Sequence, residues 1–121
     1  MADEDKLFRF QDLEVWQRAA DLAIRLGDVA DQLEELRRYR YAEQLRAAAL
    51  SISNNIAEGS GSNSKDDFRK FLNYARRSAF ECANMLLIFQ RQQLTHPENN
   101  QQLLIELSRV SRMITGLGRS L

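Results

Sequence analysis

The chain of 121 residues holds few side chains that could act as an acid, a base, a nucleophile or a metal ligand. Its only histidine, His96, directly precedes Pro97, and we expect it to cap a helix or to face solvent in a connecting segment. Its only cysteine, Cys82, falls on an apolar stripe, where cysteine behaves as a small hydrophobe and burial disfavours the thiolate. Neither residue predicts catalysis.

Two recurring site motifs are missing from the sequence. Di-iron bundles use Glu-x-x-His pairs on two helices, and a single histidine excludes that class. The glycine-rich run from Gly59 to Ser62 lacks the lysine and the flanking strand of a phosphate-binding P-loop. The sequence therefore predicts no catalytic residue, no metal site and no cofactor, and we expect the protein not to be an enzyme.

A group of polar residues falls within two segments that are otherwise patterned as helices. We interpret the group as a structural network that fixes the register of the two helices or caps the glycine-rich loop. A carboxylate such as Glu58, if buried, would need a hydrogen-bonded partner there. The alternative is a ligand site. The group comprises Gln44, Asn55, Glu58, Ser78 and Glu81.

Basic residues form two further groups. Arg69, Lys70, Arg76 and Arg77 stand at positions i, i+1, i+7 and i+8, and we expect them to form one strip on the outer face of a helix. Around the start of the preceding helix gather Arg37, Arg38, Arg40 and Arg46. Such strips bind phosphate backbones by Coulomb attraction and counterion release. The alternative is an outer face that is charged only because it is solvated.

These side chains would be carried by four amphipathic helices, because apolar residues recur every three or four positions in four segments. An antiparallel up-down-up-down four-helix bundle is the economical arrangement, with residues 1–121 as a single domain and residues 1–9 as a mobile arm. The predicted core stripe of the first helix is Leu13, Trp16, Ala20, Ala23, Gly27, Ala30 and Leu33, and that of the second helix is Tyr41, Leu45, Ala48, Ile52 and Ile56. The stripe of the third helix is Phe68, Phe71, Leu72, Ala75, Ala79, Cys82, Leu86 and Phe89, and that of the fourth helix is Leu103, Leu107, Val110, Ile114 and Leu117.

Capping residues predict most of the helix ends. Asp12 is the expected N-cap of the first helix, and the pair Ser64 and Asp67 predicts a third helix starting near residue 65. Thr95, followed by Pro97 and Glu98, predicts a capping box for the fourth helix, which we expect to end at Gly116 and Gly118. The first helix should end between residues 30 and 37. A tight turn or a long helix with a local irregularity could follow it, because no proline or glycine lies between residues 28 and 58.

The charges cancel overall but are unevenly distributed. Residues 1–35 hold ten acidic and four basic groups, a net charge of −6, whereas residues 36–121 hold seven acidic and thirteen basic groups, a net charge of +6. An acidic first helix and a basic remainder could complement each other within one chain or between subunits. With one cysteine and no signal-peptide or membrane-spanning pattern, we expect a cytoplasmic protein without a membrane partner.

Three blocks of the sequence carry a family resemblance. FQDLEVWQRA (10–19), QLRAAALSISNNIAEG (44–59) and SKDDFRKFLNYARRSAFE (64–81) resemble the four-helix-bundle family of bacterial 23S rRNA intervening-sequence proteins, a group that includes the accessory protein of diversity-generating retroelements. Related sequences often carry a proline where this chain has Ser53, and a Phe-Pro pair where it has the segment 33–41. The second helix should therefore be straighter here.

The resemblance implies a function as well as a fold. It suggests a non-catalytic homo-oligomeric scaffold, which would be a pentamer by analogy with the ring formed by the retroelement accessory protein. The scaffold would bind RNA or DNA, a reverse transcriptase, or both. The basic residues of the second and third helices would then hold the nucleic acid or the partner. The alternative is a protein-interaction module that does not bind nucleic acid.

Overall fold

The computed structural model describes residues 6–121, so residues 1–5 of the predicted arm lie outside the described residues. A short 3₁₀ helix, η2 (Arg9–Asp12), precedes four long α-helices, α1 (Glu14–Glu35), α2 (Tyr39–Ser60), α3 (Lys65–Arg91) and α4 (Pro97–Ser120). No strand occurs among residues 6–121. None of the helices in this range has the length and apolar character needed to cross a membrane.

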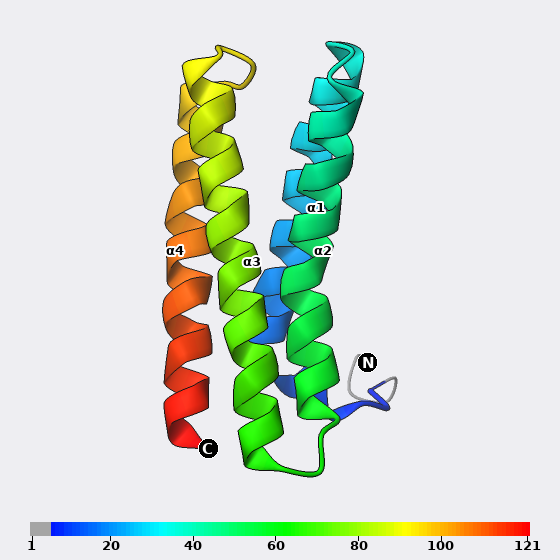
Figure 1. Ribbon diagram of the computed structural model, residues 1–121, viewed down its shortest axis with the longest axis vertical. Helices are drawn as coiled ribbons and strands as arrows, with labels where there is room; N and C mark the ends of the chain where they lie inside the picture. The colour runs from blue at the N-terminus through cyan, green and yellow to red at the C-terminus, as the bar shows by residue number, and fades with distance from the viewer. Residues whose placement is uncertain (1–5) are drawn as a thin grey trace.

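The helices form an antiparallel up-down-up-down bundle, which confirms the predicted fold (Figure 1). The α1–α2 and α3–α4 turns lie at one end, and the α2–α3 loop and the C-terminus lie at the other (Figure 1). Neighbours in sequence pack most closely, while α1 touches α4 over a shorter stretch. Within the described chain, α1 and α3 occupy diagonal positions and have no close backbone approach.

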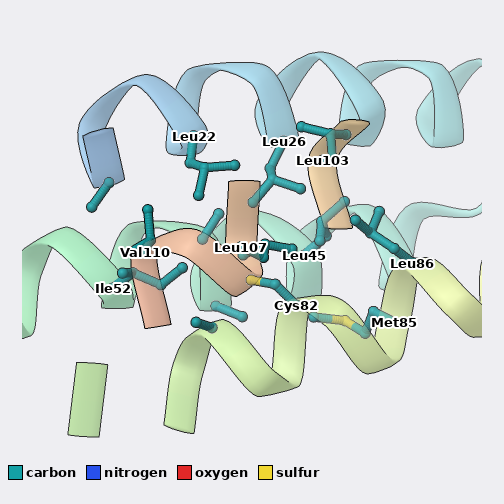
Figure 2. Close-up of a cluster of buried hydrophobic side chains, with 14 of the residues drawn as sticks. Leu22, Leu26, Leu45, Ile52, Cys82, Met85, Leu86, Leu103, Leu107 and Val110 are labelled. Atoms are coloured by element: carbon teal, nitrogen blue, oxygen red, sulfur yellow. The ribbon is translucent and has the colours of Figure 1, made fainter. Parts of the chain in front are cut away.

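The core is filled by aliphatic side chains from all four helices, and Figure 2 shows side chains such as Leu22, Ile52, Leu86 and Leu107 pointing toward one another. The predicted stripes of α2, α3 and α4 are confirmed, with only Tyr41, Phe71 and Leu117 half-buried. Burial of this apolar surface is the dominant stabilising contribution.

The stripe predicted for α1 is wrong by about one residue over most of its length. The buried residues of α1 are Val15, Ala19, Leu22, Leu26, Val29, Ala30 and Leu33. Trp16 and Ala23 lie on the flank of the core and are partly buried. Trp16 packs with its ring centroid 4.9 Å from that of Phe10, so it serves the packing role expected of it.

Two helix starts differ from the predictions. Asp12 belongs to η2, so α1 begins at Glu14 with Leu13 as N-cap and without a side-chain cap. At α4 the N-cap is His96 rather than Thr95, again without a side-chain hydrogen bond, and the Thr95 hydroxyl is buried without a partner in the described chain. Pro97 occupies the first helical position as predicted, where its missing N–H is harmless.

Other boundaries follow their expected chemistry. The Ser64 Oγ accepts a hydrogen bond from the Asp67 N–H at 3.0 Å, which confirms this cap of α3. The glycines of α4 do not end it, since the helix continues to Ser120. One glycine in a helix costs only about 1 kcal/mol, which packing of the helix offsets.

The α1–α2 connection is a tight turn, which resolves the alternative left open by the sequence. Arg37 adopts a φ of 62°, and the N–H groups of Arg37 and Arg38 donate to the carbonyls of Glu34 and Leu33, both at 2.8 Å. This is the Schellman pattern, which normally places glycine at the left-handed position. Gln93, also with a φ of 62°, ends α3 in the same way.

Candidate nucleic-acid interface

The four basic residues of α3 are all exposed and form two adjacent rows, and Arg76 and Arg77 border one shared surface depression. Successive residues of a helix are about 100° apart, so residues seven apart share a face while adjacent residues do not. Arg69 and Arg76 border the surface between α3 and α4, whereas Arg77 lies beside α2. Lys70 is seven residues from Arg77 and occupies that second row.

The surface between α3 and α4 is hollowed, and we call it the α3–α4 groove. A hollow of about 210 Å³, which we call the apolar hollow, lies toward the middle of the helices, and a second hollow of about 240 Å³, lined by both apolar and polar residues, lies toward the C-terminus; both are bordered by Arg76. No carboxylate lines either hollow. The groove is lined by Arg69, Leu72, Asn73, Arg76, Ala79, Phe80 and Ala83 of α3, and by Leu104, Leu107, Ser108, Ser111, Arg112, Ile114, Thr115 and Gly118 of α4.

Two arginines of the groove are available to a ligand. The Arg76 guanidinium lies over the Phe80 ring, 4.9 Å from the ring centroid, and Arg112 donates a hydrogen bond to the Ser108 Oγ at 2.7 Å. Neither arginine forms an ion pair with any of residues 6–121. Their positive charge is therefore not neutralised by a neighbouring carboxylate of the described chain.

Arg69 has a structural role at the same edge. Its Nε and Nη2 donate to the backbone carbonyls of Gly118 and Leu121, at 3.2 and 2.7 Å, and its Nη1 lies 2.8 Å from an Asp66 carboxylate oxygen. A cation against the last carbonyls of a helix satisfies acceptors that have no partner within the helix. Arg69 thus fastens the end of α4 to the start of α3.

The arginines near the start of α2 lie at the opposite end of the bundle from Arg69 (Figure 1). Arg37, Arg38 and Arg40 are exposed at the α1–α2 turn. Arg46 instead binds the carboxylates of Asp31 and Glu34 on α1, with its Nη2 2.9 Å from Glu34. These hydrogen bonds raise the pKa of Arg46 and lower that of Glu34. The predicted basic residues therefore belong to separate surfaces.

The predicted polar network is only partly assembled. Asn55 donates to the Ser51 carbonyl at 2.8 Å and to the Ser51 Oγ at 3.0 Å, and the hydroxyls of Ser51 and Ser78 are 2.8 Å apart. Gln44 and Glu58 are exposed, so neither belongs to a buried network.

Around this small network the surface forms an open, mostly polar depression between α2 and α3, bordered by Arg77 and Glu81. Ser51, which links the two helices, was absent from the predicted group. Its position four residues before Asn55 was the available signal, because residues at i and i+4 share a helix face.

The family model described as "23S rRNA-intervening sequence protein" matches residues 11–116, which is most of the chain. The chain belongs to this family. The matched range includes all eight basic residues singled out in the sequence and all of the α3–α4 groove except Gly118.

A solved structure supports the fold of this family member. It is the crystal structure of a protein of unknown function from the S23 ribosomal protein family of Bacteroides thetaiotaomicron, with a TM-score of 0.82 and 21% identity. The match covers 85% of this chain and 96% of the Bacteroides chain. The comparison with curated proteins finds no match.

The cysteine and the histidine of this family member occupy different environments in the bundle. Cys82 is buried, and desolvation, with the nearby Glu81 charge as a lesser cause, raises the pKa of its thiol to about 12. His96 is exposed at the start of α4. Within residues 6–121 no three histidine, cysteine, aspartate or glutamate side chains are grouped to hold a metal ion.

Proposed function

We propose that the protein is a non-catalytic, homo-oligomeric scaffold that binds nucleic acid, a reverse transcriptase partner, or both, as the resembling retroelement accessory proteins imply. The observation that carries the proposal is the α3–α4 groove, which presents Arg76 and Arg112, neither of them paired with a carboxylate of residues 6–121, and has no carboxylate in its lining. A net charge of zero does not oppose this role, because a phosphate backbone responds to the local charge of the surface that it contacts.

The polar residues of the groove suit a phosphate backbone. Asn73 and Ser108 line it beside the arginines, and side chains of these types donate to phosphate oxygens. Two arginine contacts, from Arg76 and Arg112, predict that log Kobs for a single strand falls with log salt concentration with a slope of about −1.4.

Self-association is the second part of the proposal. The acidic helix α1 and the basic helix α3 are diagonal in the bundle, so their outer faces point in opposite directions. Opposite charges on opposite sides favour head-to-tail contacts, which close into rings when the rotation between subunits permits. We propose a pentameric ring, and sedimentation equilibrium tests it: a dimer or a monomer would overturn this part.

The decisive experiment measures binding of RNA and DNA oligonucleotides by gel shift at low and high salt. The double variant Arg76→Glu/Arg112→Glu should lose binding, while the matched variant Arg38→Glu/Arg40→Glu, with the same charge change at the other end of the bundle, should keep it. The reverse result would overturn the groove as the site. Arg69 is avoided because it fastens α4.

The competing function is a protein-interaction module that does not bind nucleic acid. Absence of any gel shift by the wild-type protein at low salt would favour this module and overturn nucleic-acid binding. Circular dichroism of each variant checks that the bundle remains folded.

A further inference from the structure

The apolar hollow of the α3–α4 groove combines an apolar floor with a cationic rim. Its floor includes Ala79 and Leu107, which are almost fully buried, while Arg76, Arg112 and Ser108 stand at its rim. A site that only held phosphates would need no apolar floor. The combination of an apolar floor with a cationic and hydroxyl rim fits a flat, ring-shaped group attached to an anionic chain.

Phe80 forms one side of this hollow and is unusually exposed for a phenylalanine. It is 58% exposed, and the Arg76 guanidinium lies over its ring. Aromatic rings and guanidinium planes are the surfaces on which proteins stack unpaired bases. Phe80 also borders a second surface depression with Arg76 and Arg77, so this ring stands between two basic regions.

Ser111 supplies a polar group inside the hollow. The residue is only 6% exposed, yet its hydroxyl makes no hydrogen bond with any of residues 6–121. The hydroxyl is not fully enclosed, so it can bond water, and the edge of a ligand in the hollow could replace that water. The hydroxyl can act as donor or acceptor, so it suits the mixed edge of a base.

We propose that the apolar hollow receives one unstacked base of a single-stranded nucleic acid, with Phe80 and Arg76 as the stacking surface and Ser111 at the base edge. This inference rests on the proposed function and names its substrate class. The volume of about 210 Å³ is below the range of roughly 300–1,000 Å³ of drug-sized sites, which favours a single ring system. A paired base inside a duplex could not enter the hollow.

The charge of the groove favours a nucleic acid as its occupant. Arg76 and Arg112 form no ion pair with any of residues 6–121, and no carboxylate lines the groove. Toward the C-terminus the groove continues past Leu72 and Ile114 to Asn73. The groove thus places positive charge that no carboxylate neutralises beside an exposed aromatic ring, and a single strand would meet these with its backbone and a base.

The test is fluorescence anisotropy with three labelled probes of equal phosphate number: a single strand, an abasic single strand and a duplex. The wild-type protein should bind the single strand most tightly. Phe80→Ala should weaken that binding about tenfold or more, to the level of the abasic strand, and leave duplex binding unchanged. The matched control Leu87→Ala, another exposed apolar residue of α3, should have no effect.

The outcomes separate the two proposals. Equal binding of the abasic and intact strands, or an unchanged affinity in Phe80→Ala, would overturn the base site while the groove arginines could still hold the backbone. Loss of binding to an acidic amphipathic peptide in Phe80→Ala, with single-strand binding unchanged, would assign the hollow to a protein instead. Failure of the wild-type protein to bind any probe at low salt would overturn the proposed nucleic-acid function itself.

Discussion

A Cβ atom added to Gly59 would lie 2.7 Å from the Cβ of Phe71 and 2.9 Å from the Cδ1 of Phe68. The last turn of α2 therefore packs against α3 at a distance that only glycine permits. We expect Gly59→Ala to destabilise the protein by about 1–3 kcal/mol, because overpacking exceeds the gain of up to about 1 kcal/mol in helix propensity. Urea denaturation measures the difference.

Gly27 provides the matched control for that substitution. It lies within α1, and a Cβ there would meet nothing within 4 Å. Gly27→Ala should therefore stabilise the protein by about 0.5–1 kcal/mol through helix propensity alone. A similar change in stability for both variants would contradict the close approach at Gly59.

The left-handed residue Gln93 should be improved by glycine. A side chain at a φ of 62° is strained by roughly 1–2 kcal/mol, and glycine removes that strain while adding backbone freedom to the unfolded chain. Gln93→Gly should gain up to about 1 kcal/mol. Gln92→Gly, at a φ of −86°, should instead lose stability, so thermal melting of the two variants must shift in opposite directions.

The thiol of Cys82 should be inert in the folded protein. With its pKa raised to about 12, the thiolate population at pH 8 is roughly a thousandfold below that of an ordinary cysteine. Iodoacetamide should therefore label it at pH 8 only after addition of denaturant, as mass spectrometry would report. Rapid labelling of the native protein would show that the bundle core opens around α3.

Asp67 should make stability depend on acid pH. The Ser62 hydroxyl, and secondarily Lys70, lower the pKa of Asp67 in the folded protein below its ordinary value of 3.8. Its stabilising contribution is therefore fully present above pH 3.8 and is lost as the pH falls through the folded-state value. The urea midpoints of the wild-type protein and Asp67→Asn should differ at pH 6 and converge toward pH 2.5; a constant difference would contradict this.

The sequence predicted the architecture well where periodicity alone decides it. Leu45, Ile52, Phe89 and Val110 lie in the core because residues three and four apart share one side of a helix. The α1–α2 turn was harder to predict because Arg37 occupies the left-handed position where glycine is the usual signal.

The candidate site was less accessible from sequence than the fold. Glu58 is exposed because its position on α2 turns it away from α3. Successive residues of a helix are about 100° apart, so an error of one position changes a predicted buried residue into an exposed one. The apolar hollow combines Phe80 of α3 with Leu104 and Ser111 of α4. Which faces of two helices meet is a property of packing, so periodicity within each helix cannot reveal the pairing.

The diagonal placement of acidic α1 and basic α3 has a consequence for how the protein moves before any contact is made. A particle whose positive and negative charges are separated across its width experiences a torque in the field of a polyanion, even when its total charge is zero. It would rotate to present α3 and keep α1 turned away. Added salt would shorten the reach of that torque, so encounters would begin from more random orientations.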